Sequence, residues 1–168
     1  MKQTALAFAL AASLATPLAA APAPRVSIQT INQLAQPLPL PYHEGANADR
    51  DVAAARARAK ATHKKLLIDL GGNWCPDCRV LAGIMELPEV RRFVAQHYEV
   101  VTVDVGRFDR NGQIPAHYGI TGRLKGVPSL LIVDPRNDKL INEGRTAALA
   151  DARSMTPQAL ADWLAQWA

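Results

Sequence analysis

Two kinds of hydrophobic pattern alternate along this chain. Stretches with apolar residues at helical spacing are separated by short, continuous apolar runs of the kind found in buried strands. Helices are predicted over residues 49–62, 76–85, 88–97 and 113–118, and from residue 157 towards the end. Strands are predicted over residues 66–70, 99–105, 130–133 and 139–142. This order predicts an α/β protein in which helices flank both faces of a central mixed β-sheet.

Helix-start signals support these assignments. Pro76, Pro88 and Pro157 each stand where a helix is expected to begin, and proline is favoured in the first helical turn. Thr156 is placed to cap the last helix through its hydroxyl group. The same helix carries one apolar stripe at helical spacing, formed by Leu160, Trp163, Leu164 and Trp167.

The first 41 residues differ in character from the rest of the chain. Residues 1–21 have the order of parts of a signal peptide: Lys2, an apolar run over residues 5–15, and small residues at 19–21. The run is too short to span a bilayer, although a retained membrane anchor is the alternative interpretation. Residues 22–41 hold five prolines and are predicted to form an extended linker with one short strand over residues 26–31. Residues 42–168 then form a single domain.

Composition and charge agree with one ordinary globular domain. Of the 168 residues, 49% are hydrophobic and 20% are charged, which argues against a disordered chain. The formal net charge is +4, with acidic and basic residues interspersed. The basic cluster in and after the first predicted helix consists of Arg56, Arg58, Lys60, Lys64 and Lys65. Because aromatic residues do not accompany it, we interpret it as a solvated helix face and expect no nucleic-acid binding.

The chemistry of the chain is concentrated in its two cysteines, Cys75 and Cys78, which form a C-P-D-C motif after a predicted strand and at the start of a predicted helix. The first turn of a helix presents unpaired N–H groups and the positive end of the helix dipole, and both stabilise a thiolate. Cys75 is therefore expected to be a nucleophile. Cys78, one turn later, can attack a mixed disulfide formed at Cys75. In an exported protein, where disulfides persist, this pattern predicts a thiol–disulfide oxidoreductase.

Three other interpretations of the cysteine pair remain open. A structural disulfide that closes so short a loop would contribute only roughly 2 kcal/mol, which makes it a poor staple. A carrier of copper or zinc could use the same thiols, although zinc prefers four ligands and the four histidines are scattered along the sequence. The pair could also be a vestige on a non-enzymatic binding module. No further metal ligands and no organic cofactor are predicted.

Two motifs resemble the thioredoxin superfamily. The stretch from Asp69 to Cys78, D-L-G-G-N-W-C-P-D-C, is similar to the strand, turn and helix of that family's active site. The stretch from Gly126 to Ser129, G-V-P-S, is similar to its cis-proline loop, and Tyr118 to Ile120 also fits. The resemblance covers about residues 42–168, and implies a thioredoxin-like domain with the thioredoxin fold. It is closest to exported bacterial thioredoxin-like proteins and to the thioredoxin-like domain of transmembrane thiol reductases.

The resemblance implies roles for individual residues. Cys75 would be the nucleophile and Cys78 the resolving thiol. Asp69 would be a carboxylate that is buried beneath Cys78 and helps to deprotonate the Cys78 thiol. The alternative is that Asp69 is a partly buried acid at the end of a strand and has no catalytic role. Pro128 would form a cis peptide bond beside the disulfide, and the Val127 backbone would offer hydrogen bonds to a substrate chain.

Two further residues beside Cys75 are assigned to substrate binding. Pro76 follows the nucleophile in the first helical turn, and Trp74 precedes it. Trp74 is interpreted either as a platform for the substrate or as ordinary packing.

The sequence departs from the family pattern at three places. Thioredoxins often carry a lysine near the buried acid on the neighbouring strand, where this chain offers valines, with Val100 as the expected match. This weakens the case for a proton relay through the acid. The helix proline usual five residues after the second cysteine is replaced by Gly83. Residues 123–126 resemble an insertion before the cis-proline loop that reshapes substrate access.

Asp77, between the two cysteines, is expected to tune the redox potential. A carboxylate near Cys75 disfavours the thiolate, and so destabilises the dithiol relative to the disulfide. We therefore expect a reductant rather than a strong oxidant, and we expect Asp77→His to raise the reduction potential.

These observations predict a protein-disulfide reductase that acts on disulfide-containing exported proteins, either in a bacterial periplasm or after secretion. Its electrons would come from a partner, and a membrane thiol reductase is the candidate donor. Because no segment after the signal peptide is apolar enough to span a bilayer, no stable membrane insertion is expected once that peptide is cleaved.

Overall fold

The computed structural model describes residues 21–168, so the predicted signal peptide lies outside the described residues except for Ala21. The helices are α1 (Ala48–Ala61), α2 (Pro76–Glu86), α3 (Pro88–His97), α4 (Gln113–His117) and α5 (Pro157–Gln166), with short 3-10 helices η1 (Ile31–Gln33) and η2 (Ala152–Ser154). The strands are β1 (Lys65–Gly71), β2 (Tyr98–Asp104), β3 (Ser129–Asp134) and β4 (Lys139–Leu140). The helices and strands predicted for residues 42–168 are present, and β4 is shorter than expected.

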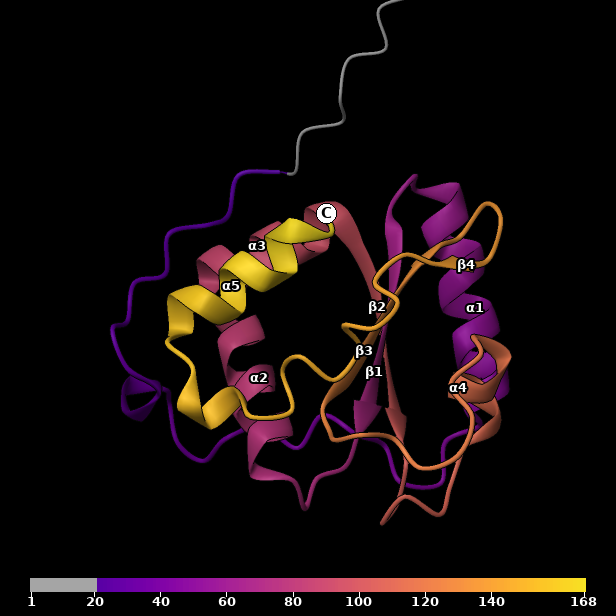
Figure 1. Ribbon diagram of the computed structural model, residues 1–168. Helices are drawn as coiled ribbons and strands as arrows, with labels where there is room; N and C mark the ends of the chain where they lie inside the picture. The colour runs from indigo at the N-terminus through magenta and orange to yellow at the C-terminus, as the bar shows by residue number, and fades with distance from the viewer. Residues whose placement is uncertain (1–20) are drawn as a thin grey trace, which may run out of the picture.

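The strands form one mixed sheet in the order β2-β1-β3-β4. Strand β1 is parallel to β2 and antiparallel to β3, and β4 is antiparallel to β3. Helices α2, α3 and α5 cover one face of the sheet, while α1 and α4 cover the other (Figure 1). The predicted fold class, a central mixed sheet flanked by helices on both faces, is confirmed.

The two faces of β1 bury different parts of the core, because successive side chains of a strand point to opposite sides. Leu67 belongs to the cluster formed with α2, α3 and α5. Leu66, Ile68 and Leu70 belong to the cluster formed with α1 and α4. All four side chains are fully buried, so β1 contributes to the core on both faces of the sheet.

The last helix begins and packs as predicted. The Thr156 hydroxyl group accepts a hydrogen bond from the backbone N–H of Ala159 at 3.1 Å, which caps α5. Leu160 and Leu164 are fully buried and Trp163 is 6% exposed, whereas Trp167 lies beyond the helix at its C-cap and is partly buried.

Residues 22–41 run across the outside of the helical layer that contains α2 and α5, and we call them the N-terminal strap (Figure 1). The predicted strand over residues 26–31 is wrong, since the strap forms no strand and its regular structure is limited to η1. The physical reason is that side chains of the domain satisfy the strap's backbone. Gln158 of α5 accepts from the N–H of Val26 at 2.9 Å and donates to the carbonyl oxygen of Pro24 at 3.0 Å.

The strap is packed on the domain rather than separate from it, which differs from the extended linker expected for these residues. Leu34 is 4% exposed and belongs to the core cluster of α2, α3 and α5. Leu34 and Leu38 both cross α2 at Gly83, where an added Cβ would lie 3.3 Å from a methyl carbon of each leucine. Glycine at this position therefore gives the strap room to approach the helix.

Within residues 21–168, no helix combines the length and the hydrophobicity that crossing a bilayer would require.

We predict that the strap contributes to the stability of the domain. Leu34→Ala should lower the free energy of unfolding by roughly 2–4 kcal/mol, because it leaves a cavity in the core. Leu40→Ala, in the same strap but 63% exposed, should change it by less than about 0.5 kcal/mol. Urea denaturation followed by tryptophan fluorescence measures both values, and equal values for the two variants would contradict the packing described for the strap.

Candidate functional site

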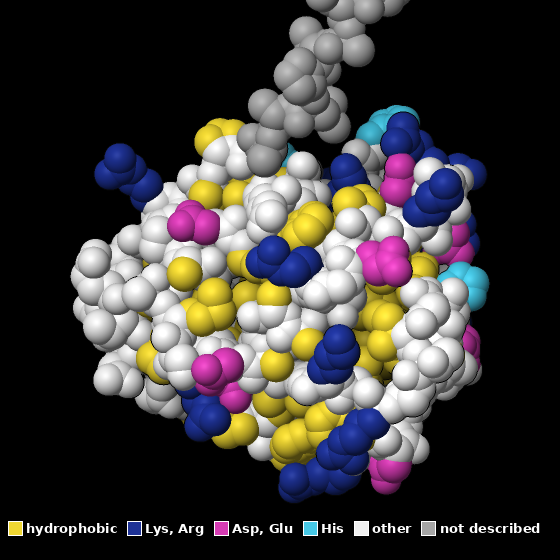
Figure 2. All heavy atoms as spheres, in the orientation of Figure 1, with side chains coloured by type: hydrophobic (Ala, Val, Ile, Leu, Met, Phe, Trp, Pro, Cys, Tyr) yellow, Lys and Arg dark blue, Asp and Glu magenta, His cyan; other side chains and the backbone are white. Residues whose placement is uncertain are grey.

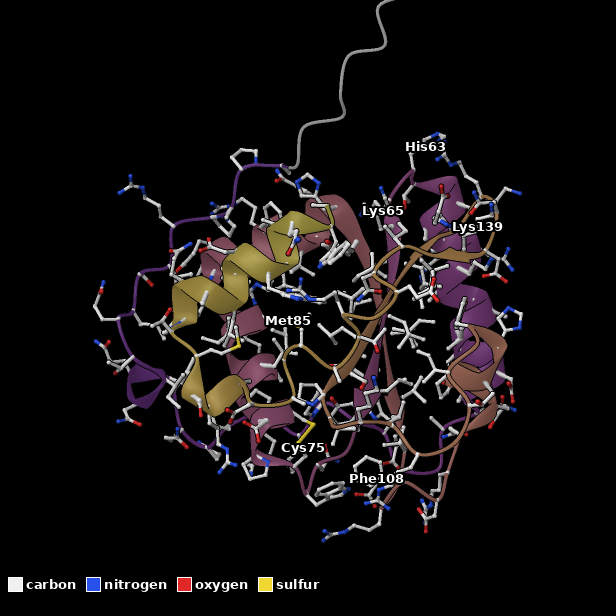
Figure 3. All side chains as sticks on the ribbon, viewed as in Figure 1. His63, Lys65, Cys75, Met85, Phe108 and Lys139 are labelled. Carbon is white, nitrogen blue, oxygen red and sulfur yellow. A yellow bond between two sulfur atoms is a disulfide. The ribbon has the colours of Figure 1, made fainter. Side chains whose placement is uncertain are left out.

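The two cysteines lie where β1 meets α2, at the lower edge of the molecule in Figure 3. A turn after β1, in which the N–H of Cys75 donates to the carbonyl oxygen of Gly72 at 3.0 Å, brings the chain into the helix. Cys75 is the N-cap of α2, and Cys78 lies one turn into it. The two form a disulfide, with Cα atoms 5.3 Å apart.

The two sulfur atoms have different surroundings. The Cys75 sulfur accepts a hydrogen bond from the backbone N–H of Cys78 at 3.2 Å, as a helix-capping group does. A thiolate at Cys75 would also lie at the positive end of the dipole of α2. Cys75 is 3% exposed and Cys78 is fully buried, so Cys75 is the sulfur that an incoming group can reach.

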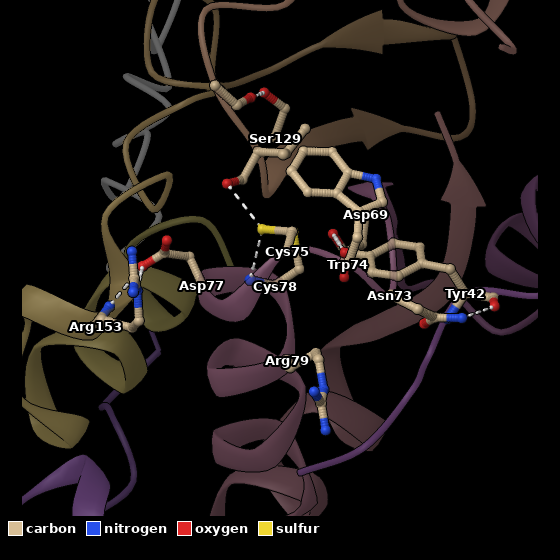
Figure 4. Close-up of a disulfide and its surroundings, with 12 residues drawn as sticks. Tyr42, Asp69, Asn73, Trp74, Cys75, Asp77, Cys78, Arg79, Ser129 and Arg153 are labelled. Atoms are coloured by element: carbon tan, nitrogen blue, oxygen red, sulfur yellow. Dashed lines mark hydrogen bonds and ion pairs between the residues drawn. A yellow bond between two sulfur atoms is a disulfide. The ribbon is translucent and has the colours of Figure 1, made fainter. Parts of the chain in front are cut away.

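The cis-proline loop faces the disulfide. The peptide bond between Val127 and Pro128 is cis, and the carbonyl oxygen of Val127 lies 3.4 Å from the Cys75 sulfur. The hydroxyl group of Ser129 donates to the carbonyl oxygen of Gly126 at 2.7 Å, which closes the loop. The fold therefore brings together the two motifs that carried the resemblance, although they are far apart in the sequence (Figure 4).

Asp69 lies inside the protein near the end of β1. Its side chain is 2% exposed and accepts a hydrogen bond from the Tyr42 hydroxyl group at 2.8 Å. Burial raises the pKa of Asp69 to about 7, although the hydrogen bond from Tyr42 acts in the opposite direction. Burial also raises the pKa of Tyr42, as does the negative charge of Asp69, so the phenol stays a proton donor. Asp69 is therefore a carboxyl group that exchanges protons near neutral pH.

Tyr42 reaches this position because its own backbone, directly after the strap, is hydrogen-bonded to the turn that precedes Cys75. The side chain of Asn73 accepts from the backbone N–H of Tyr42 at 3.1 Å and donates to its carbonyl oxygen at 2.8 Å (Figure 4). The Tyr42 hydroxyl group and the Cys78 sulfur both lie where a Cβ at Gly71 would be, so that a side chain at Gly71 would clash with both. The phenol of Tyr42 therefore lies close to both the Asp69 carboxyl group and the Cys78 sulfur.

Sequence reasoning missed Tyr42 and chose the wrong neighbour on β2. The residue paired in register with Asp69 is Thr102, whereas Val100 pairs with Leu67. Thr102 donates its hydroxyl hydrogen to the carbonyl oxygen of Pro41 at 2.9 Å, and so holds the strap rather than the acid. No local pattern marks Tyr42, because its contacts come from residues remote in the sequence.

Asp77 points away from the disulfide towards η2. One of its oxygens accepts hydrogen bonds from the backbone N–H and the guanidinium group of Arg153, at 2.9 and 3.1 Å (Figure 4). The side chain of Asp77 is buried, while that of Arg153 is 55% exposed. The negative charge expected beside Cys75 is therefore present, but it is paired with a cation.

Trp74 forms an exposed wall beside Cys75. It is 37% exposed, and its indole N–H donates to the carbonyl oxygen of Gly106 at 2.6 Å. Its ring packs against Phe108, with ring centroids 5.9 Å apart. Pro76 is exposed at the first turn of α2. Both residues are accessible beside the nucleophile expected from the sequence.

Within residues 21–168, no three side chains of the types His, Cys, Asp and Glu come together as a potential metal site.

Comparison with known proteins agrees with this arrangement. The family described as Thioredoxin-like matches residues 47–135. Among solved structures, the chain is similar to a disulphide isomerase from Xylella fastidiosa Temecula1, with 38% identity and a TM-score of 0.69, over 76% of this chain and 96% of that one. It also matches a DsbH oxidoreductase at 21% identity and a TM-score of 0.39, over 62% of this chain and 74% of that one. A comparison with curated proteins found no match.

The buried acid predicts an unusual dependence of stability on pH. The pKa of Asp69 rises from an ordinary value of 3.8 to about 7 on folding. The folded protein therefore binds this proton more tightly than the unfolded chain does, and stability falls as the pH rises through this range. Asp69→Asn should be more stable than the wild type at pH 8, by roughly 2–4 kcal/mol, and the difference should shrink towards pH 4.

Denaturation of the oxidised protein between pH 4 and pH 8 measures this effect. Glu44→Gln serves as the control, because it removes a carboxylate charge from an exposed position that makes no ion pair within residues 21–168. An Asp69→Asn variant that is no more stable than the wild type at pH 8 would contradict the raised pKa.

Proposed function

The chain belongs to the thioredoxin-like family and is a thiol–disulfide oxidoreductase, and from that premise we propose that it reduces disulfides of exported proteins. The observation that carries the proposal is the Cys75–Cys78 disulfide at the N-terminus of α2, opposite the Val127–Pro128 peptide. The predicted signal peptide, residues 1–21, supports export to a periplasm, and residues 42–168 supply the redox domain. A membrane thiol reductase is the proposed electron donor.

In the proposed reaction, the Cys75 thiolate attacks one sulfur of a substrate disulfide. A mixed disulfide forms and the first substrate thiolate leaves. The Cys78 thiolate then attacks the Cys75 sulfur, which closes the Cys75–Cys78 disulfide and releases the second substrate thiolate. The substrate gains two electrons and the protein loses two, and the donor must return them for the next cycle.

The surroundings of each sulfur favour these roles. The dipole of α2 and the N–H of Cys78 stabilise a thiolate at Cys75. Cys78 lacks exposure and must lose its proton inside the protein. We assign the role of proton acceptor to Asp69 together with Tyr42, because the phenol lies next to the Cys78 sulfur and donates to the acid. An acid whose pKa is about 7 is suited to accept and return a proton at neutral pH.

Disulfide isomerisation is a second candidate function. It is favoured by the similarity to the Xylella fastidiosa protein, which is described as a disulphide isomerase. Isomerisation uses the same first attack by Cys75 but returns the mixed disulfide to another cysteine of the substrate, without net electron transfer. Refolding of a scrambled multi-disulfide protein separates the two functions, since a reductase consumes dithiol in proportion to the bonds it breaks.

The cysteine cycle gives the direct test of the proposed function. Cys75→Ser should abolish reduction of a protein disulfide, whereas Cys78→Ser should trap a mixed disulfide with the substrate, because nothing resolves it. Non-reducing electrophoresis and mass spectrometry detect that adduct. A redox titration of the wild type should give a midpoint near or below about −270 mV for a reductant, and a value near about −120 mV would instead indicate an oxidant.

The copper or zinc carrier predicts a different result in the same experiment. The purified protein would then bind metal stoichiometrically through the two thiols, and Cys78→Ser would trap no substrate.

Asp77 gives a second prediction. Asp77→Asn keeps an oxygen that can accept from Arg153 but removes the negative charge near Cys75. It should raise the reduction potential, by about 10–30 mV, because a more stable thiolate favours the reduced form. Arg153→Gln is the matched control and should lower the potential, since it removes the cation that offsets Asp77. Shifts of the same sign in both variants would contradict the electrostatic argument.

A further inference from the structure

Two packed aromatic rings, with an arginine on each of them, form a row on the surface beside the disulfide. The guanidinium carbon of Arg107 lies 4.5 Å from the centroid of the Trp74 ring. The Trp74 ring packs against Phe108, and the guanidinium carbon of Arg123 lies 4.0 Å from the centroid of the Phe108 ring. We call these four residues the arginine–aromatic ladder. Trp74, which directly precedes Cys75, places one end of the ladder beside the nucleophile.

The loop that carries Arg107 and Phe108 of the ladder is tightly held. Phe108 has a φ of 69°, which is uncommon for a residue with a side chain, and Gly106 has a φ of 56°. The carbonyl oxygen of Val105 accepts from the N–H groups of Phe108, Asp109 and Arg110, at 2.9 to 3.3 Å. A strained residue that persists beside an active site is a reason to look for a function.

The charges of the ladder are available to a ligand. Within residues 21–168, neither Arg107 nor Arg123 makes an ion pair or a side-chain hydrogen bond to the protein. Their flat faces lie on aromatic rings, so the N–H edges remain free to bind carboxylates. Asp109, the acid in this loop, accepts a hydrogen bond from the backbone N–H of Arg107 at 2.9 Å.

The other acids of this region are already paired. Asp104 lies 3.5 Å from the guanidinium group of Arg110, and Asp77 lies 3.1 Å from that of Arg153. Figure 2 shows hydrophobic side chains gathered at the lower edge of the molecule with Lys and Arg side chains beside them, in the region where Figure 3 labels Cys75 and Phe108. This edge therefore combines an apolar surface with Arg107 and Arg123, which make no ion pair within residues 21–168, and with one exposed acid, Asp109.

We propose that the arginine–aromatic ladder binds acidic residues that flank the disulfide of the substrate protein. The occupant is an extended segment with Asp or Glu within a few residues of its half-cystine, which reaches Cys75 with its carboxylates on Arg107 and Arg123. Charge complementarity carries this choice, since arginine binds carboxylates through two parallel N–H groups. The inference rests on the proposed function and names the substrate class of the same site.

The test compares three synthetic peptides that share one disulfide and differ in the flanking residues, which are Glu, Gln or Lys. The reduced wild-type protein should react with the Glu peptide faster than with the Gln peptide by roughly three- to ten-fold, as two exposed charge pairs would give. The Lys peptide should be the slowest, and the differences should shrink as salt is added. Stopped-flow tryptophan fluorescence measures the second-order rate constants.

Charge-reversal variants then locate the preference. Arg107→Glu and Arg123→Glu should each remove most of the preference for the Glu peptide, and Arg107→Gln should reduce it by a smaller factor. Lys139→Glu makes the same change in net charge on β4, at the opposite end of the molecule from Cys75 (Figure 3), and should keep the preference. Circular dichroism checks that each variant is folded.

The outcomes separate the inference from the function on which it rests. Equal rates for all three peptides would overturn the ladder proposal and leave disulfide reduction standing. An equal loss of preference in Lys139→Glu would also overturn it, because net charge alone would then explain the selectivity. A wild-type protein that reduces no peptide would overturn both proposals.

Discussion

The hydrogen bond between the Tyr42 hydroxyl group and the Asp69 carboxylate joins the residue that directly follows the N-terminal strap to the central strand of the sheet. A carboxyl group that is 2% exposed needs a partner, because burial without one costs several kcal/mol. The neighbouring strand provides none, since Thr102, which pairs with Asp69, is used to hold Pro41. The partner comes instead from a segment that precedes the sheet in sequence, and the strap must therefore pack closely on the domain.

This requirement explains several features that look unrelated in the sequence. Arg79 of α2 donates to the carbonyl oxygens of Leu38 and Pro39, at 2.8 and 3.2 Å, and so ties the strap to the active-site helix. Gly83 gives the strap room to cross the same helix. Gly71 leaves space for the Tyr42 phenol beside the Cys78 sulfur. The strap, helix α2 and the cysteine pair are consequently packed directly against one another.

The parts of the fold that depend on local signals were predictable from the sequence. Pro76 and Pro157 begin helices because proline suits the first helical turn. Short apolar runs form buried strands, and such a run is visible in the sequence without knowledge of its neighbours. The position of the cysteine pair at a helix N-terminus was predictable for a local reason too, because Pro76 lies inside the motif. The strap was not predictable, because alternating apolar residues at 26–31 resemble a strand while its backbone is satisfied by distant side chains such as Gln158.

The partners of charged side chains are the second feature that could not be predicted from the sequence. Asp77 was expected to place a negative charge beside Cys75, and its cationic partner, Arg153 of η2, lies 76 positions further along the chain. Residues 123–126 resembled an insertion in the sequence, which does not show that Arg123 packs on the Phe108 ring. Both cases concern side chains whose partner is chosen by the tertiary fold, which periodicity and propensity do not encode.

The two cysteines have different surroundings, because the fold places the helix dipole at Cys75 and the buried acid on the side of Cys78. Cys75 lies at the end of a helix dipole that favours its thiolate, and Asp77 with its paired Arg153 adjusts that effect only partly. Cys78 lies on the side of the buried acid, where a neutral Asp69 favours no charge and an ionised Asp69 opposes a second one nearby. In the proposed cycle an ionised Asp69 takes the proton of Cys78, which leaves one negative charge on the sulfur beside a neutral acid. Because the pKa of Asp69 is about 7, the acid is ionised in part of the molecules at neutral pH and can accept this proton, whereas the helix dipole stabilises a thiolate at Cys75 directly.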